Sequence, residues 1–198
     1  MTDLSKSLQA SDPYHAVLNA AKSIEMRLAR PDDAAYIYSL RINPAYNQHL
    51  SSAPPTVEAQ AKFLEGYVER EQAGKEFYFI IKNKSTGKDC GTVRIYDLRD
   101  DSFCWGSWIL DENKTRFAAI ESALFIYDFG FGELKFGSSH FDVRKDNVKV
   151  ISFHERFGAQ RISENELDVF FTLSRSDLNT KLSDLLSITN YQPVYLSA

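Results

Sequence analysis

Three groups of residues in this sequence have the types and spacing to do chemistry. The first is Lys114-Thr115-Arg116-Phe117-Ala118-Ala119, directly before a stretch with helical periodicity. The first turn of a helix has backbone N–H groups without intrahelical partners and the positive end of the helix dipole, so it attracts anions. Lys114 and Arg116 add positive charge. The segment is therefore a candidate phosphate site, with a plain solvated helix start as the alternative.

The second group lies on a later predicted helix. Asn147, Ile151 and His154 are spaced four and three residues apart, so they share one face of that helix. An imidazolium has a pKa near the working pH of most enzymes and can act as a proton donor. The alternative is a half-buried histidine that packs beside the neighbouring apolar residues Val150, Phe153 and Phe157.

The third group consists of candidate proton acceptors near the ends of predicted strands: Asp97, Asp111, His140 and Asp142. Each is more often a solvated or capping residue in proteins. Because His140 and Asp142 are two residues apart in a strand, they share one face of the sheet. We rank Asp142 first as a general base. The sequence contains no Ser-His-Asp arrangement, nucleophile elbow or acidic metal loop, and we expect no metal site.

The elements that must position these residues follow from periodicity and turn residues. Residues 24–28 are predicted as a first strand, and Arg30-Pro31-Asp32-Asp33 begins a helix that reaches about Asn43, because Pro and acidic residues are favoured in a first turn. A polar loop over 44–55 leads to Thr56, which caps a second helix that Gly74 ends.

Three predicted strands at 76–82, 90–97 and 102–110 are joined by short turns, which is typical of an antiparallel meander. After Asp111 the period changes from 2 to 3.6, and apolar residues from Ile120 to Leu134 predict a long helix. A strand at 140–143, a helix at 147–157, a hairpin at 159–163 and 168–173, and a helix at about 174–186 complete the order.

Composition limits the function classes. A chain of 198 residues with 43% apolar and 25% charged residues can bury a core as one α/β domain. The net charge of −4, without a long basic run, argues against nucleic-acid binding. Cys90 and Cys104 would lie too far apart for a disulfide, which favours a reducing compartment. No apolar run is long enough to span a membrane and residues 1–21 have no signal-peptide pattern, so we expect a cytoplasmic protein.

From Ile24 to about Ser174 the order of predicted elements resembles the GNAT superfamily of acyl-CoA-dependent N-acyltransferases. The segments that carry the resemblance are Arg30-Pro31-Asp32-Asp33, Trp105 to Ala123, and Phe141 to Gly158. The resemblance implies an α/β fold with a mixed, mostly antiparallel central sheet flanked by helices. We divide the chain into a leader over 1–23 that is a short packed helix or disordered, a GNAT domain over 24–174, and a C-terminal helix and tail over 175–198.

The resemblance also implies acetyl-CoA as the acyl donor and suggests where it binds. The phosphate turn of the superfamily corresponds to residues 114–119, where Phe117 replaces the first expected glycine and threatens to crowd the phosphate. The Leu110 N–H is the expected partner of the thioester carbonyl, and Asn147 is expected to contact the pantetheine arm. The cofactor-binding residues implied in this way are Leu110, Lys114, Thr115, Arg116, Phe117, Ala118, Ala119, Asn147 and Phe153.

The resemblance also implies which residues act in catalysis and which bind the acceptor. His154 lies four residues before Gly158, where the superfamily commonly has a tyrosine that protonates the departing thiolate. In the acceptor loop Tyr46 to Leu50 we select Asn47 and His49 as substrate-binding residues. The expected activity is acetyl transfer to a primary amine, with a nucleotide-linked aminosugar favoured as acceptor. A protein N-terminus and a non-catalytic acyl-CoA-binding module are the alternatives, and a homodimer is possible.

Overall fold

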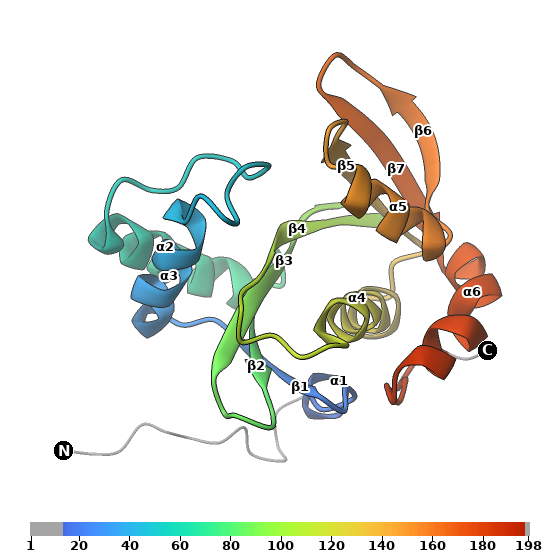
Figure 1. The fold of residues 1–198 in the computed structure, drawn as a ribbon, viewed down its shortest axis with the longest axis horizontal. Coiled ribbons are helices and arrows are strands. Elements are labelled where there is room, and N and C mark those ends of the chain that lie inside the picture. Colours follow the sequence, from blue (N-terminus) through green and yellow to red (C-terminus); the bar gives the residue numbers. More distant parts are fainter. Residues whose placement is uncertain (1–13, 197–198) are drawn as a thin grey trace.

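Seven strands form a single mixed sheet in the computed structural model, which describes residues 14–196 (Figure 1). The strand order is β1-β2-β3-β4-β5-β7-β6, and only the β4–β5 pair is parallel among the described strands. This is the predicted mixed, mostly antiparallel sheet. The strands are β1 Ile24–Leu28, β2 Phe77–Asn83, β3 Asp89–Arg99, β4 Ser102–Leu110, β5 Ser138–Arg144, β6 Gln160–Glu164 and β7 Asp168–Ser174.

The helices follow the predicted order, and the main difference from the prediction is at the end of α4 (Ala118–Asp128). The expected long helix after Asp111 is α-helical only to Asp128 and continues as a π-helical turn, η2, over Phe129–Glu133. Of the leader expected over 1–23, residues 1–13 lie outside the described part, and a short helix follows at once. The helical elements are α1 His15–Leu18, η1 Pro31–Asp33, α2 Ala34–Ile42, α3 Val57–Gln72, α4 Ala118–Asp128, α5 Val148–Arg156 and α6 Arg175–Ile188.

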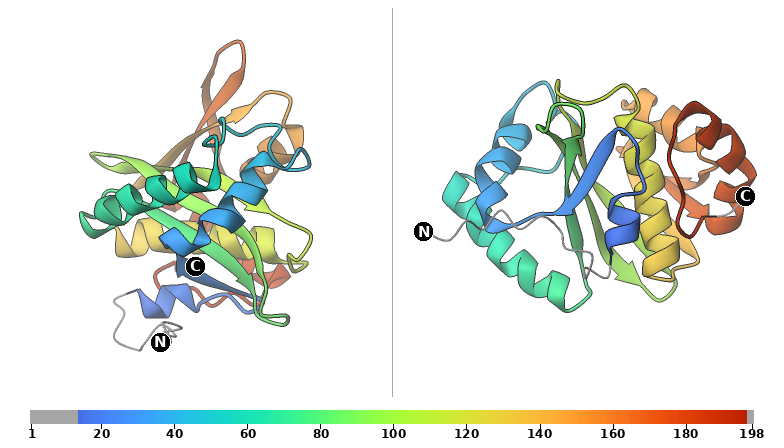
Figure 2. Two further views of the ribbon diagram at one scale, coloured as in Figure 1. Left: turned by 90° about the vertical axis from the view of Figure 1, so that its left-hand side faces the viewer. Right: turned by 90° about the horizontal axis from the view of Figure 1, so that it is seen from below.

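Helices cover both faces of the sheet, and the alternation of side chains along β2 shows which residues face which helices. Phe77, Phe79 and Ile81 belong to the larger core, which α1, α4 and α6 also enter, whereas Tyr78 and Ile80 pack in a smaller core with α2 and α3. Figure 2 shows α2 and α3 on one side of the strands and α4 with α6 on the other. The two faces can therefore carry separate sites.

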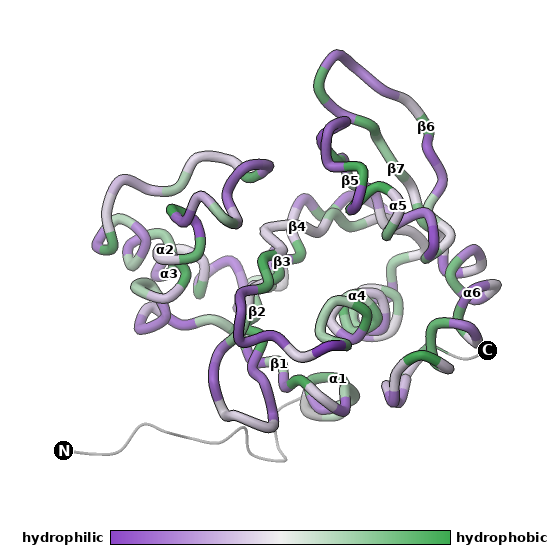
Figure 3. The backbone as a smooth tube through the Cα atoms, viewed as in Figure 1, coloured by the Kyte–Doolittle hydropathy of each residue, from purple (hydrophilic) through white to green (hydrophobic). Residues whose placement is uncertain are grey.

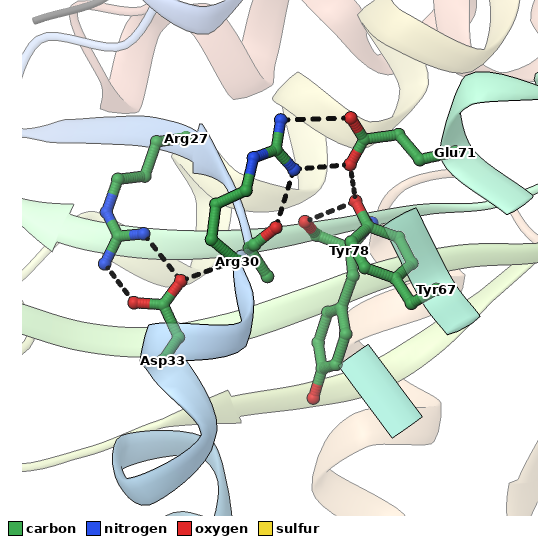
Figure 4. Close-up of polar contacts among 7 residues, drawn as sticks. Arg27, Arg30, Asp33, Tyr67, Glu71 and Tyr78 are labelled. Carbon is green, nitrogen blue, oxygen red and sulfur yellow. Dashed lines mark hydrogen bonds and ion pairs between the residues drawn. The ribbon is translucent and has the colours of Figure 1, made fainter. Parts of the chain in front are cut away.

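A polar network fixes α3 to the sheet where β2 extends past β1 (Figure 4). The Tyr67 hydroxyl accepts a hydrogen bond from the Tyr78 N–H at 3.0 Å and lies 3.2 Å from the Tyr78 carbonyl. It also donates to Glu71, which forms an ion pair with Arg30 at 2.7 Å. The Tyr78 carbonyl also accepts from the Ala29 N–H at 2.8 Å, so the Tyr67 hydroxyl serves mainly to satisfy the Tyr78 N–H, and this holds α3 over the sheet.

The central helix α4 contains two fully buried acids, Glu121 and Asp128, and both are hydrogen-bonded. The Asp128 carboxylate accepts hydrogen bonds from the Tyr191 hydroxyl and from three backbone N–H groups of residues 194–196, at 2.7 to 3.1 Å. A buried carboxylate is tolerated only with such partners. Asp128 therefore anchors the chain segment after α6 onto α4.

The strand β6 forms a largely hydrophilic edge of the sheet, whereas its neighbour β7 is largely hydrophobic (Figure 3). Every residue of β6 is exposed, and the edge carries charged side chains such as Arg161 and Glu164, which oppose pairing with another strand. The two cysteines, Cys90 and Cys104, are free and buried, as expected. Within residues 14–196 no helix has the length and apolar character needed to cross a bilayer.

Candidate active site

The β4 and β5 strands separate soon after they meet, and this separation creates the site. Their parallel pairing is limited to Ser102 with Ser138 and Phe103 with Ser139. The Ser139 hydroxyl donates to the Phe103 carbonyl at 3.1 Å, at the last paired position. From residue 104 onward the facing edges of the two strands are unpaired, so their backbone groups are available to a bound molecule.

A bulge in β4 shapes the same region. Three residues of β3, from Thr92 to Arg94, oppose four residues of β4, from Gly106 to Ile109. Ser107 adopts a left-handed φ of 46°, which is uncommon for a non-glycine residue and often found at functional sites. A Cβ on Gly106 would lie 2.9 Å from the Tyr96 hydroxyl. Gly106 therefore lies at the bulge and also leaves room for the Tyr96 ring.

A cavity of about 350 Å³ lies between the separated strands, and we call it the transfer cleft. β4 and β5 form its two walls, α5 closes one end, and the loop between α2 and α3 covers another. The residues that line it are Tyr46, His49, Leu50, Ser51, Tyr96, Trp105, Gly106, Ser107, Trp108, Phe141, Asp142, Val143, Arg144, Asn147, Val150 and His154. The pair Trp105 and Trp108 was not predicted, although two tryptophans around a glycine in a strand are a usable signal.

The predicted phosphate turn begins α4. Phe117 is the N-cap residue with a φ of −102°, so this backbone does not require glycine. The Arg116 guanidinium lies 5.4 Å from the centre of the Phe117 ring. Lys114 and Arg116 are exposed, and the first backbone hydrogen bond of α4 runs from the Glu121 N–H to the Phe117 carbonyl. The N–H groups of Ala119 and Ile120 precede that bond, so the turn keeps the donors that an anion needs.

Contacts to the segment before β1 hold this turn in place. The Thr115 hydroxyl forms a 2.6 Å hydrogen bond with the Ser23 hydroxyl. The Glu121 carboxylate accepts hydrogen bonds from the Ser23 hydroxyl at 2.6 Å and from the N–H groups of Lys22 and Ser23. Thr115 is thus occupied by a structural contact. Ser23 and Glu121 position the turn, and nothing in their local spacing in the sequence indicated it.

His154 is surrounded by aromatic rings rather than by charges. It is 5% exposed, and its ring centre lies 4.3 Å from that of Phe141 and 5.2 Å from that of Trp105. Its Nδ1 atom has no hydrogen-bond partner among the described residues. Burial lowers the pKa of His154 to about 3, so the ring is neutral near pH 7. A resting imidazolium acid, as expected from the sequence, does not fit this environment, although the ring lines the cleft.

Of the other residues predicted to contact the cofactor, Asn147 lines the cleft, whereas Phe153 and Leu110 do not. Asn147 lines the cleft, and its side chain also caps α5 by accepting from the Val150 N–H at 3.4 Å. Phe153 packs against Trp108 at a ring distance of 5.0 Å and does not itself line the cleft. Leu110 also lies outside the lining. Because the Asp111 N–H bonds to Cys90 of β3 and successive N–H groups alternate, the Leu110 N–H faces the β5 side.

Of the four candidate bases, only Asp142 lines the transfer cleft. Burial, with a contribution from the nearby Asp168 carboxylate, raises the pKa of Asp142, which makes it a stronger base than an ordinary aspartate. His140 is engaged elsewhere, by the Ser102 hydroxyl at 2.8 Å and by Asp97 at 3.1 Å. Asp111 is buried and accepts from the Tyr36 hydroxyl at 3.0 Å.

The predicted acceptor loop reaches over the cleft and is attached at two points. The Tyr46 hydroxyl donates to Glu112 at 2.5 Å, and His49 lies 3.4 Å from Asp146. His49 lines the cleft, as its selection as a substrate-binding residue requires. Asn47 does not line it. No group of three or more His, Cys, Asp or Glu side chains placed to hold a metal ion occurs within residues 14–196.

Comparisons with known proteins agree with this architecture. The model of the acetyltransferase (GNAT) domain matches residues 23–160. The solved structure of apo FdhC, a nucleotide-linked sugar GNAT, is 39% identical, with a TM-score of 0.78 over 89% of this chain and 97% of that one. A search of the curated proteins gives no match.

More distant structures share the fold. Ribosomal-protein-S5-alanine acetyltransferase from Vibrio fischeri is 18% identical, with a TM-score of 0.66 over 77% of this chain and 93% of that one. A chimera of spermidine N-acetyltransferase SpeG from Vibrio cholerae is 16% identical, with a TM-score of 0.65 over 79% of this chain and 98% of that one. The family match covers most of the chain and agrees with the separated strands and the α4 turn, so this protein belongs to the GNAT acetyltransferase family and is an acyltransferase.

Proposed function

We propose that this enzyme transfers an acetyl group from acetyl-CoA to the primary amine of a nucleotide-linked aminosugar. The observation that carries the choice of acceptor is the 39% identity to FdhC, a nucleotide-linked sugar GNAT, over nearly the whole of both chains. The ribosomal-protein acetyltransferase shares only 18% of its residues and therefore supports the fold alone. A protein N-terminus is the alternative acceptor.

The acetyl-CoA phosphates would bind at the start of α4, with Lys114 and Arg116 supplying charge and the Ala119 and Ile120 N–H groups supplying donors. The pantetheine arm would pass between β4 and β5 toward Asn147. The Leu110 N–H would polarise the thioester carbonyl from the free edge of β4. Phe117 stays compatible with phosphate because its backbone has an ordinary φ.

The reaction is a direct attack within the transfer cleft. The amine nitrogen forms a bond to the thioester carbon, the carbon–sulfur bond breaks, and the sulfur leaves as a thiolate. Asp142 accepts the first proton, which the ammonium must lose before the amine attacks, and the nitrogen loses its second proton to solvent as the carbon–sulfur bond breaks. His154, neutral in its aromatic surroundings, donates a hydrogen bond from its ring N–H to the thiolate, which then takes its proton from solvent. Most of the rate enhancement comes from positioning of the reactants.

The direct test combines binding with acceptor choice. Acetyl-CoA is titrated calorimetrically, and thiol release is then followed with a nucleotide-linked aminosugar and with a peptide that has a free N-terminus. We expect micromolar acetyl-CoA binding, about −8 kcal/mol, and turnover with the sugar alone. Turnover with the peptide alone would show that the acceptor is a protein N-terminus. If acetyl-CoA did not bind, the proposed mechanism would be wrong.

A further inference from the structure

A second cavity lies beside the transfer cleft, on the face of the sheet that α2 and α3 cover. Its volume is about 380 Å³, and we call it the arginine pocket. It shares Ser51 and Ser107 with the transfer cleft, so one elongated ligand could occupy both. The lining residues that matter for its chemistry are Arg41, Gln60, Phe63, Tyr78, Arg94 and Ser107.

The position of this pocket separates it from the proposed coenzyme site. Tyr78 belongs to the smaller core under α2 and α3, whereas α4 packs into the core on the opposite face of the sheet. The two layers are visible on either side of the strands in Figure 2. A ligand in the arginine pocket would therefore approach the β4 bulge from the side opposite to Lys114 and Arg116.

Buried polar atoms in the pocket lack partners. Among the described residues only four buried side-chain atoms have no hydrogen bond, and two of them, Arg41 Nε and the Tyr78 hydroxyl, belong to lining residues. Gln60, which is 1% exposed, also lines the pocket. Figure 4 shows the Tyr78 phenol pointing away from the Tyr67–Glu71 network. Because buried polar groups are almost always satisfied in proteins, the two unsatisfied atoms indicate a missing partner, and both can donate.

The charge of the surroundings identifies that partner. The Glu76 carboxylate is shared by Arg70 and Arg94, each with Nε at 2.6 Å. Arg41 forms no ion pair with any carboxylate in residues 14–196, and its Nη2 atom donates to oxygens of Ser51 and Ser52. Two guanidinium groups, those of Arg41 and Arg94, line the pocket, and the only carboxylate that either of them contacts in residues 14–196, Glu76, is shared with Arg70. A local excess of positive charge, in a chain of net charge −4, favours an anion.

We propose that the arginine pocket binds the phosphate groups of the acceptor, with Arg41, Arg94, Tyr78 and Gln60 as donors. The inference rests on the proposed function, because it supplies the diphosphate recognition that a nucleotide-linked sugar requires. The two lining guanidinium groups, Arg41 and Arg94, offer several N–H donors, which suit the oxygens of a diphosphate better than a single carboxylate. The sugar would then extend past Ser51 and Ser107, so that its amine enters the transfer cleft near Asp142.

Inorganic pyrophosphate is the probe, titrated calorimetrically into the full chain. The Lys114→Ala, Arg116→Ala double variant serves as the background, because it removes competing binding at the α4 turn. In that background we expect saturable binding that Arg41→Gln weakens at least tenfold. Equal affinity with and without Arg41→Gln would overturn the assignment. Succinate is titrated in parallel, and binding of succinate without pyrophosphate would show that the pocket takes a carboxylate.

Tyr78→Phe is the matched variant that separates recognition from folding. It removes only a hydroxyl that lies near the Arg41 and Thr92 side chains but makes no hydrogen bond of good geometry, so we expect an unchanged or higher thermal midpoint together with a several-fold loss of pyrophosphate affinity. A midpoint lowered by more than about 4 °C would show that the hydroxyl is structural and would remove Tyr78 from the site.

Acetyl-CoA titration distinguishes failure of the pocket from failure of the transferase mechanism. Acetyl-CoA binding together with Arg41-independent pyrophosphate binding would overturn the pocket and leave the proposed function intact. Arg41-dependent pyrophosphate binding without acetyl-CoA binding would support the pocket and overturn the proposed function.

Discussion

Two kinds of buried polar side chain occur in this protein, and they lie in different regions. Glu121 and Asp128 on α4 are fully buried, and hydrogen bonds from distant segments satisfy both carboxylates. His154 in the transfer cleft and Tyr78 in the arginine pocket are also buried, yet each has an atom without a partner. The α4 acids stabilise the fold. The unsatisfied groups reduce stability in the free protein, which is typical of residues kept for a ligand.

The largest effect is expected from Asp128→Ala. The change leaves the Tyr191 hydroxyl and three backbone N–H groups buried without an acceptor, so we expect a loss of about 3–5 kcal/mol in the free energy of unfolding. Urea unfolding measures it, with the exposed Asp184→Ala on α6 as control. Similar free energies of unfolding for Asp128→Ala and Asp184→Ala would contradict the conclusion that the contacts of Asp128 stabilise the fold.

The second prediction concerns pH and His154. Its pKa is about 3 when folded and near 6.5 when unfolded, so between these values the unfolded chain binds a proton that the folded chain does not. Its contribution to stability is therefore complete above pH 6.5 and is lost as the pH falls toward 3. Between pH 8 and 5 we expect the loss to be about 2 kcal/mol.

His154→Phe provides the reference for this measurement, because the variant lacks the titrating group and suits the aromatic surroundings. Denaturant unfolding at both pH values isolates the histidine as the difference between wild type and variant. We expect the variant to be as stable as wild type or more stable at pH 7, with turnover reduced about tenfold or more. An identical pH dependence would mean that His154 is not held neutral, and unchanged turnover would assign it to packing.

A third prediction tests the α4 turn. Lys114→Ala with Arg116→Ala removes two exposed cations, so acetyl-CoA affinity should fall about tenfold while stability changes by less than about 0.5 kcal/mol. Calorimetric titration at two salt concentrations checks it, because the wild-type affinity should depend more strongly on salt. Unaltered affinity would place the coenzyme phosphates elsewhere.

The smallest effect is expected from Gly106→Ala in the β4 bulge. The added methyl group would meet the Tyr96 hydroxyl at 2.9 Å, and the end of that side chain can shift. We expect a stability change of about 1 kcal/mol or less, with a larger relative change in acceptor KM than in acetyl-CoA affinity. Steady-state kinetics separate the two constants. A change confined to acetyl-CoA affinity would place the bulge on the coenzyme side.

Local sequence patterns predicted much of the fold. The period-2 meander, the Thr56 cap and the Gly74 stop correspond to the observed β2–β4 strands and to α3. These signals act over a few residues, so no knowledge of the folded chain is needed to use them. The end of α4 was harder to place because the apolar pattern continues through the π-helical turn to Leu134.

The sequence located parts of the candidate site best where a backbone N–H group or an exposed charged side chain is the feature that matters. The structure starts α4 directly after the turn at 114–119 and places Asp142 and His49 beside the transfer cleft, and their roles stay predictions. Asn47 lies away from the cleft, and Thr115 and Asn147 make structural hydrogen bonds. The Thr115 contact depends on Ser23, which lies 92 positions earlier in the chain.

By itself the sequence determined the element order, the family and the basic helix start, because each depends on short-range periodicity or on a local motif. The tertiary structure alone decided the protonation of His154 and the existence of the arginine pocket. Both depend on which side chains, from β2 to α5, come together in a space that excludes water. The pKa of His154 and the unsatisfied donors of the arginine pocket depend on these tertiary contacts, and the spacing of residues along the chain does not specify such contacts.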